Sequence, residues 1–250
     1  PLLSLRRTAF AALRSSLGGG NEVGEAWIAT AKIARRAGHM QTAYSATLQA
    51  TQNQATFAFV QRVKILAKEE QTHAAIRDLV NSLNTLVSSF KPTEHGDTGR
   101  SSVIELQGTD ADGRTVRIDR DAYAKACLLR ARLQDSTFRY TANEILDRYK
   151  EAAKEQHDSE KMWYHLGHFQ DTHEGLLPNM AMQRYNVCRA FLRSAQVGTK
   201  FFYRTLPRVL TIWMDMAADD QILNFNKKGP TADAELAQKF DAFAQLNILM

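Results

Sequence analysis

The stretch Trp27–His39 reads WIATAKIARRAGH and is typical of a helix that ends in a tight turn. Its aromatic and small residues recur at helical spacing and form one stripe: Trp27, Ala31, Ala34 and Ala37. Gly38 follows the stripe, and glycine is the residue that most readily takes the left-handed conformation after a helix. We therefore predict a helix over residues 24–37 that stops at Gly38.

Small residues beyond this turn indicate a helical repeat. Tetratricopeptide (TPR) units are helix pairs of about 34 residues, with Trp opening the first helix, Gly at the turn and Ala where the helices cross. Four residues fit this frame: Trp27, Gly38, Ala43 and Ala50. Ala75 lies about one unit after Ala43, and Trp163 with Gly167 marks a later helix opening. The match is degenerate, because Glu70 stands at a turn where glycine is expected.

The fold class follows from the same pattern continued along the chain. Apolar residues recur at helical spacing almost throughout, and proline occurs only five times in 250 residues. We predict an all-α protein, an α-solenoid of divergent TPR/HEAT-like helix pairs with one polar loop insertion. The expected parts are a helix tail and Gly-rich loop in 1–23, TPR-like repeats in 24–90, the insertion in 91–120, and helical repeats in 121–250.

The insertion differs from its surroundings in composition. It opens with the polar run Lys91–Gly99, and two β-like runs, Val103–Leu106 and Thr115–Ile118, then flank Asp112-Gly113. Asp-Gly between such runs is a hairpin signal, although an isolated hairpin is marginally stable in water. We predict that residues 91–120 are either a flexible surface loop or a short hairpin.

Glycine and proline also predict helix boundaries. Gly18–Asn21 contains three consecutive glycines, whose backbone entropy opposes a helix, so we expect a break there. Pro207 lacks an amide hydrogen and must either kink a helix or begin a new one. Two further stripes are expected to face inward: Phe138, Ala142, Ile145 and Tyr149 in one helix, and Phe202, Leu206, Leu210 and Trp213 in another.

Composition excludes several classes of protein. No apolar run approaches the roughly 20 residues of a membrane span. The net charge of +5 comes from Lys and Arg interleaved with Asp and Glu, which favours a solvated helical surface over a nucleic-acid site. Cys127 and Cys188 lie in apolar helical patterns and match no zinc motif, so we expect buried free thiols. Because the chain lacks an initiator Met, we expect a segment of a longer protein.

Candidate chemistry is limited to a histidine-rich region. It contains four histidines in one helical stretch: His157, His165, His168 and His173. His165 and His168 share a helix face and could hold a metal with Glu160 or Asp171. Acidic partners on other helices cannot be identified, however, so surface or capping histidines are favoured. We predict no catalytic, cofactor-binding or metal-binding residue in this segment, and we expect Trp163 and Trp213 to be core residues.

One stretch resembles a known family. Phe191–Asp215, FLRSAQVGTKFFYRTLPRVLTIWMD, is similar to the C-terminal part of FAT domains in phosphatidylinositol-3-kinase-related protein kinases, and within them to the ATR-type branch. Pro207 and Arg208 through Trp213 are its most specific part. Other stretches match in order, over roughly residues 24–225 but not 91–120: Trp27–Ala31, Ala34–His39, Gln41–Tyr44, Ile145–Lys150 and Trp163–Phe169. The structural signature comprises Trp27, Gly38, Ala43, Trp163, Gly167, Pro207, Arg208 and Trp213.

The resemblance implies a helical scaffold within a nuclear DNA-damage checkpoint serine/threonine kinase. Such a segment would position and restrain its own kinase domain, assemble with an ATRIP-type partner subunit, and support a dimer of the full-length protein. ATP and Mg would belong to the kinase domain of that protein, and we expect no direct DNA contact and no membrane contact. Three alternatives remain: a free-standing TPR-like adaptor that binds protein partners, a nucleic-acid-binding solenoid, and a metal-dependent helical enzyme.

Overall fold

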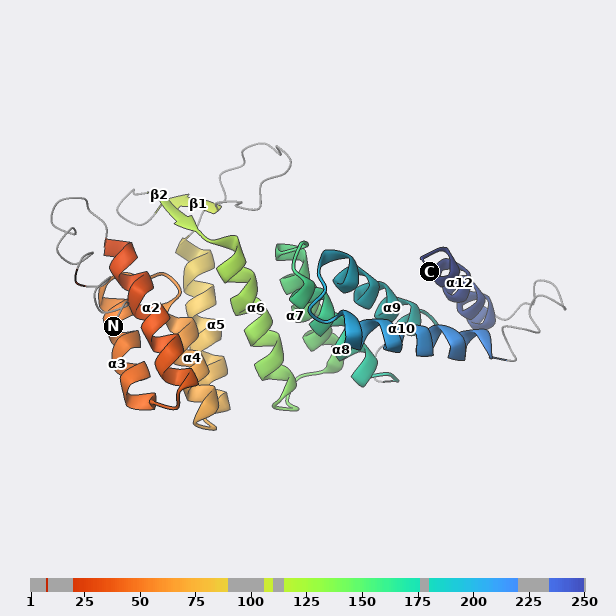
Figure 1. Ribbon diagram of the computed structural model, residues 1–250, viewed down its shortest axis with the longest axis horizontal. Helices are drawn as coiled ribbons and strands as arrows, with labels where there is room; N and C mark the ends of the chain where they lie inside the picture. The colour runs from red at the N-terminus through yellow and green to blue at the C-terminus, as the bar shows by residue number, and fades with distance from the viewer. Residues whose placement is uncertain are drawn as a thin grey trace. The chain divides into compact units, whose positions relative to one another are not determined.

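The computed structural model describes residues 8, 20–89, 106–109, 115–175, 180–219 and 234–249. This part of the chain is helical apart from two short strands, so the predicted all-α class is confirmed (Figure 1). The chain divides into two compact units, Pro1–Thr137 and Phe138–Met250. The helix expected to open the segment 121–250 therefore belongs to the first unit rather than the second.

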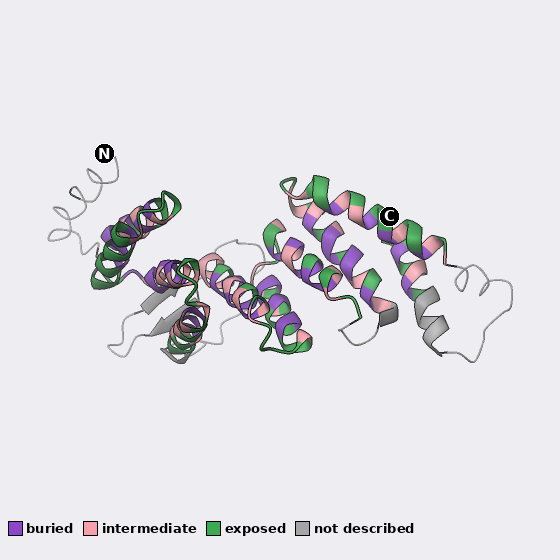
Figure 2. Cartoon of the chain, turned by 90° about the horizontal axis from the view of Figure 1, so that it is seen from below, coloured by how far each residue is buried: buried purple, intermediate pink, exposed green. Residues whose placement is uncertain are grey.

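The first unit is a row of helices in chain order. They are α2 (Gly20–Arg36), α3 (Met40–Gln52), α4 (Ala58–Lys68), α5 (Thr72–Ser89) and α6 (Arg120–Asp135). Each packs on the next, which is the arrangement expected of stacked helical repeats (Figure 1). Burial follows stripes along the helices, with exposed residues on the opposite faces (Figure 2).

The turns of this unit repeat one backbone motif. Gly38, Gln54 and Glu70 follow α2, α3 and α4 at even spacing, and all have positive φ, at 87°, 57° and 63°. In each turn the next amide donates back to a carbonyl in the last helical turn, which is a Schellman bond. The bonds run from His39 to Ala34 (2.9 Å), from Ala55 to Ala50 (3.0 Å) and from Gln71 to Leu66 (3.0 Å). Glu70 thus has the conformation for which glycine was expected.

Small residues let the helices of the first unit approach closely. Ala43, Ala50 and Ala75 are fully buried, as helix crossings require. A Cβ placed on Gly24 would lie 2.7 Å from the Cβ of Ala55, so α2 meets the turn after α3 without room for a side chain. A larger cluster joins α4, α5 and α6: Phe59, Val60, Val63, Ala75, Leu79, Leu83 and Ala126.

Two short strands lie within the predicted insertion. β1 (Leu106–Thr109) and β2 (Thr115–Ile118) pair antiparallel, with Leu106 opposite Ile118 and Thr109 opposite Thr115. The polar run Lys91–Gly99 lies outside the described residues. Directly after β2, the side chain of Asp119 accepts a hydrogen bond from the Asp121 amide at 2.9 Å and caps α6.

The second unit is built around its longest helix. α7 (Ala142–Glu155) packs on α8 (Glu160–Thr172), and α8, α10 (Phe202–Ala217) and α12 (Ala234–Leu249) all pack on α9 (Met180–Val197). The core contains aromatic, aliphatic and sulfur side chains: Tyr164, Val187, Cys188, Phe191, Val209, Ile212, Met216, Ala242 and Leu246. Cys127 in the first unit and Cys188 in the second are buried, and neither forms a disulfide.

Three predictions at helix boundaries are corrected. α2 begins at Gly20, so this glycine is helical. The first amides of a helix need no intrahelical partner, and glycine is tolerated there. Phe138 is 89% exposed with a φ of 52°, because it lies in the turn before α7 rather than in a buried stripe. α7 begins after Thr141, whose side chain forms a capping box with Glu144. Ala37 is likewise an exposed turn residue.

The orientation of α10 also differs from the prediction. Pro207 is an internal residue of α10, so the alternative that it begins a new helix is wrong. The buried face comprises Thr205, Val209, Ile212 and Met216. Phe202 and Leu210, expected to face inward, are 44% and 38% exposed. α10 is therefore apolar on two faces, and the pattern alone could not select the inner one.

Candidate protein-interaction site

One face of α8 carries the contacts that fix α9 and α10. Glu160, Tyr164, Gly167 and Asp171 recur at helical spacing, and we call them the α8 stripe. Each member makes a different kind of contact with the elements that follow. These contacts concern the stretch Phe191–Asp215, which contains the most specific part of the predicted signature.

Glu160 holds the turn between α9 and α10. Its Oε1 accepts a hydrogen bond from the Phe201 amide at 2.6 Å, at the start of α10, where a carboxylate is favoured by the helix dipole. The Ser194 hydroxyl donates to the Glu160 carbonyl at 3.0 Å. A Cβ on Gly198 would overlap the Glu160 carboxylate, so glycine leaves space for this contact.

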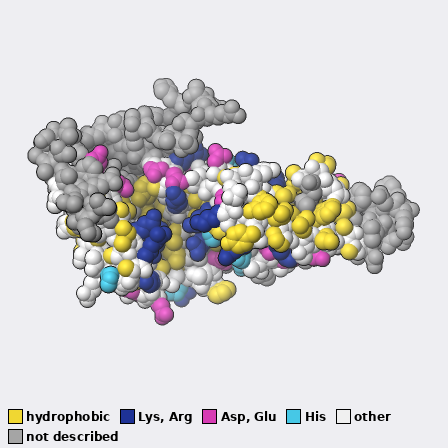
Figure 3. Space-filling view, viewed as in Figure 1, with side chains coloured by type: hydrophobic (Ala, Val, Ile, Leu, Met, Phe, Trp, Pro, Cys, Tyr) yellow, Lys and Arg dark blue, Asp and Glu magenta, His cyan; other side chains and the backbone are white. Residues whose placement is uncertain are grey.

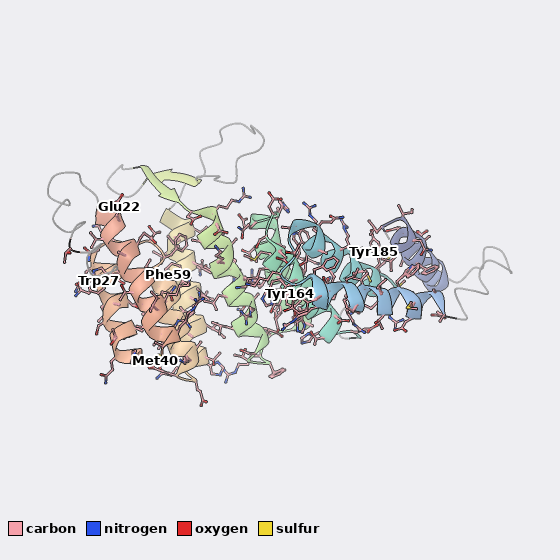
Figure 4. All side chains as sticks on the ribbon, in the orientation of Figure 1. Glu22, Trp27, Met40, Phe59, Tyr164 and Tyr185 are labelled. Carbon is pink, nitrogen blue, oxygen red and sulfur yellow. The ribbon has the colours of Figure 1, made fainter. Side chains whose placement is uncertain are left out.

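The middle of the α8 stripe makes apolar contacts. Tyr164 is labelled in Figure 4. Its ring stacks on that of Phe201 with a centroid distance of 4.2 Å and an interplanar angle of 9°. A Cβ on Gly167 would lie 2.8 Å from the Phe191 ring, so the missing side chain lets α9 approach α8. The signature residue Gly167 is therefore a packing residue.

Asp171 anchors α10 further along. The Nε atom of Arg208 donates to Oδ1 and Oδ2 of Asp171 at 3.1 and 3.0 Å, and its Nη2 donates to Oδ1 at 2.7 Å. This bond to Asp171 raises the pKa of the Arg208 guanidinium above its ordinary value. Such a fork-shaped pair fixes orientation as well as distance. On another side of α10, the Trp213 indole donates to Asn247 Oδ1 of α12 at 2.7 Å.

These anchors leave an apolar face of α10 in solvent. Tyr203, Leu210 and Met214 are 68%, 38% and 64% exposed, and Pro207 on the same face is also exposed. In the space-filling view, apolar side chains gather over α10 (Figure 3). We call these four residues the α10 outer face. A contiguous exposed apolar patch of this kind is typical of a protein-interaction surface.

A second feature of this unit is a groove of about 390 Å³, which we call the α7–α9 groove. It is lined by Leu146 and Lys150 of α7, by Trp163, Leu166 and Gln170 of α8, and by Gln183, Asn186, Arg189 and Ala190 of α9. Its lining combines amides, cations and apolar side chains. No Asp or Glu belongs to it.

The predicted signature residues are distributed over both units. Trp27, Gly38 and Ala43 serve repeat packing and the first turn, whereas the other five lie on α8 and α10 of the second unit. Trp163 is partly buried, and its Nε1 donates to the His157 carbonyl at 2.8 Å. Trp213 is also partly buried. The sequence pattern indicates Glu160 and Asp171 only as possible metal ligands, whereas in the structure both carboxylates accept hydrogen bonds from other elements of the second unit.

The histidine-rich region is not arranged as a metal site. Among the described residues, no group of three or more His, Cys, Asp and Glu side chains is placed to hold a metal ion. His157 stacks on Trp163, and His173 stacks on Phe169 at a centroid distance of 4.3 Å. The same part of the chain contains no helix long and apolar enough to cross a membrane.

Comparisons with known proteins agree with this picture. A family model described as the FAT domain matches residues 1–211. The chain is 24% identical over 244 residues to serine/threonine-protein kinase ATR of Arabidopsis thaliana, covering 86% of this chain and 9% of that protein. It is 26% identical over 208 residues to protein kinase rad3 of Schizosaccharomyces pombe, covering 78% of this chain and 8% of that protein. The chain thus spans less than a tenth of these relatives.

Proposed function

Because this chain belongs to the FAT-domain family, we propose that it is a regulatory scaffold within an ATR-like checkpoint serine/threonine protein kinase. In this proposal the segment positions and restrains the kinase domain of its own polypeptide. The described residues contribute surfaces and packing to this role, and the catalytic residues belong to the kinase domain.

The α10 outer face carries the proposal. Its four residues are apolar and exposed. The rest of α10 is held in place by contacts with Glu160 and Asp171 of the α8 stripe and by the hydrogen bond of Trp213 to α12. A rigid apolar ridge loses little conformational entropy on docking, so burial of the ridge translates efficiently into binding. We assign the kinase domain as its occupant, since both relatives are named protein kinases and most of their length lies outside this segment.

Docking of this kind regulates by shifting a population. If the kinase domain has a restrained and an active state, a ridge that binds the restrained state better holds the unstimulated protein there. Assembly with an ATRIP-type subunit, dimerisation of the full-length protein and nuclear localisation complete the proposal. ATP and Mg would bind in the kinase domain, with no direct DNA or membrane contact by this segment.

The test uses the full-length kinase with Leu210→Ser and Met214→Ser combined. Both side chains are exposed, so the change removes apolar contact without opening a core. A loss of about 1 kcal/mol of docking energy should raise unstimulated phosphorylation of a serine peptide roughly fivefold. Leu48→Ser is the control, because Leu48 is 46% exposed on α3, outside the α10 outer face. Unstimulated and stimulated activities equal to wild type in the double variant would refute the proposal.

A second function is favoured by the α7–α9 groove. Helical-repeat proteins bind extended peptides in grooves lined by amides and cations, and this groove has both. The chain could therefore act as a TPR-like adaptor for protein partners. This function does not require a kinase domain, and a purified chain that binds peptides by itself would support it.

A further inference from the structure

We infer that the α7–α9 groove binds an extended acidic peptide segment of a protein partner. The groove lies wholly within the second unit and is lined by α8 and by the two helices that pack on it, α7 and α9. Its volume of about 390 Å³ is within the range of small ligand sites. The inference does not depend on the kinase-positioning proposal.

Charge selects an anionic ligand. Lys150 lines the groove from α7 and Arg189 lines it from α9, while the lining has no acidic side chain. The Nζ atom of Lys150 lies 3.6 Å from Oδ1 of Asp147, whose side chain is 74% exposed. Such a solvated ion pair contributes little to stability, so Lys150 can pair with a ligand instead. Within the described parts of the chain, Arg189 has no hydrogen-bond or ion-pair partner. Each of these two cations can pair with a carboxylate of a ligand that lies in the groove.

A buried acceptor selects a ligand that also donates. Gln170 is 6% exposed, and its Oε1 is buried without a hydrogen-bond partner among the described residues. The neighbouring Gln183 is satisfied, since its Nε2 donates to the Gln170 carbonyl at 3.0 Å and its Oε1 accepts from the Gly175 amide at 3.4 Å. An unpaired buried acceptor is unfavourable in the free protein. A rotation of the Gln170 side chain toward the groove would let this oxygen accept from a peptide amide or a serine hydroxyl.

The remaining lining favours a peptide over a simple anion. Asn186 offers both a donor and an acceptor, as a peptide backbone requires. Trp163 and Leu146 add apolar contact, and the indole is held in place by its bond to the His157 carbonyl at 2.8 Å. An inorganic anion would use only the two cations. An extended segment with Asp or Glu, serine and one apolar side chain would use the whole groove.

The first experiment measures peptide affinity with the complete 250-residue chain. The probe is a fluorescein-labelled ten-residue peptide built from Asp, Glu, Ser and Leu, and binding is followed by anisotropy. We expect Arg189→Glu to weaken binding of this acidic peptide about tenfold. A matched peptide in which Asn and Gln replace Asp and Glu should bind the wild-type chain at least about tenfold more weakly than the acidic peptide does. Arg193→Glu is the control, because Arg193 lies on the same helix but outside the groove. Equal losses in the two arginine variants, or equal affinity for the two peptides, would overturn the inference.

The second experiment separates binding from folding through Gln170→Met. Removing an unpaired buried acceptor should leave the thermal midpoint unchanged or raise it. The same change should weaken peptide binding about fivefold, because the ligand loses its acceptor. Unaltered affinity in this variant would contradict the assigned role of Gln170. Full displacement of the labelled peptide by equimolar inorganic phosphate would show a simple anion site and would also overturn the inference.

The two proposals fail separately. If Arg189→Glu loses peptide binding while the kinase remains regulated as in the wild type, the proposal for the α10 outer face is unaffected. Altered regulation in the Leu210 and Met214 variant, with no peptide binding by the wild-type chain, would refute only the groove inference.

Discussion

Arg208 of α10 and Asp171 of α8 form a two-pronged ion pair whose shortest bond is 2.7 Å, although the two residues are far apart in the sequence. Arg208 lies on α10 beside Pro207 of the outer face. The guanidinium of Arg208 contacts Asp171 of the α8 stripe. The pair therefore links the internal packing of the second unit to the orientation of its exposed apolar ridge.

The first prediction concerns the strength of this pair. The Arg208 side chain is 40% exposed and that of Asp171 is 22% exposed, so solvent screens part of their attraction. We expect Arg208→Ala and Asp171→Ala each to lower the free energy of unfolding by about 1 kcal/mol, with a coupling energy of similar size. Urea unfolding of the single and double variants measures both quantities.

The geometry of the pair provides its own control. Arg208→Lys keeps the charge but cannot make the fork of hydrogen bonds, so it should recover less than half of the loss seen with alanine. A lysine variant as stable as wild type would show that only charge matters. Additive losses in the two alanine variants would show that the contact contributes nothing.

The sequence predicts where the helices lie but not which side chains make contacts between helices that are far apart in the chain. Regular spacing of apolar residues and the TPR-like alanines placed the helices, because burial of one stripe per helix dictates that pattern. It could not choose the face of α10, where Thr205 is buried and Leu210 is partly exposed, since both faces are largely apolar. Nor could it assign Glu160 and Asp171, because the partners of a carboxylate depend on where a later helix packs.

The turns show another limit of local rules. Glycine is the residue expected in a left-handed turn, and Gly38 meets that rule with a φ of 87°. Gln54 and Glu70 take the same conformation with ordinary side chains, at φ values of 57° and 63°. Schellman bonds and the packing of adjacent helices over-determine these turns, so the strain is tolerated.

The second prediction follows from that strain. Glu70→Gly should raise the free energy of unfolding by about 0.5–1 kcal/mol. Removal of the Cβ relieves the strain of the left-handed conformation in the folded chain, while glycine also increases the conformational entropy of the unfolded chain. We expect the first, stabilising effect to exceed the second, destabilising one. Glu70 is exposed, so few contacts are lost. Thermal and urea unfolding of the purified chain measure the change.

Glu69 is the matched control for this substitution. It precedes Glu70 and has a φ of −87°, which any residue adopts. Glu69→Gly should therefore lower stability by a few tenths of a kcal/mol, through the greater freedom of the unfolded chain. Equal effects of glycine at the two positions would contradict the assignment of strain to Glu70.

The third prediction concerns the thiol of Cys188. Burial, with a smaller contribution from Asp171, raises the pKa of this thiol to about 12. The folded state therefore favours the protonated thiol more than the unfolded state does, where the pKa is near 9.0. The contribution of this thiol to the free energy of unfolding is complete below pH 9 and is lost as the pH rises toward 12. Cys188 should not react with a thiol reagent at pH 8 in the folded chain, and both cysteines should react in urea. Rapid labelling of Cys188 without denaturant would show that the α8, α9 and α10 core opens readily.

The fourth prediction concerns the close packing of Gly167 in α8 against Phe191 in α9. Alanine is favoured over glycine inside a helix by about 1 kcal/mol, so Gly167→Ala would stabilise an unpacked helix. Here the new Cβ would lie 2.8 Å from the Phe191 ring, which is only 4% exposed and has little space to move. We expect overpacking to dominate and the variant to lose about 1–2 kcal/mol of unfolding free energy. Introducing Phe191→Leu provides space, so Gly167→Ala should be nearly neutral in that background. An equal loss in both backgrounds would mean that Gly167 is required for a reason other than its contact with Phe191.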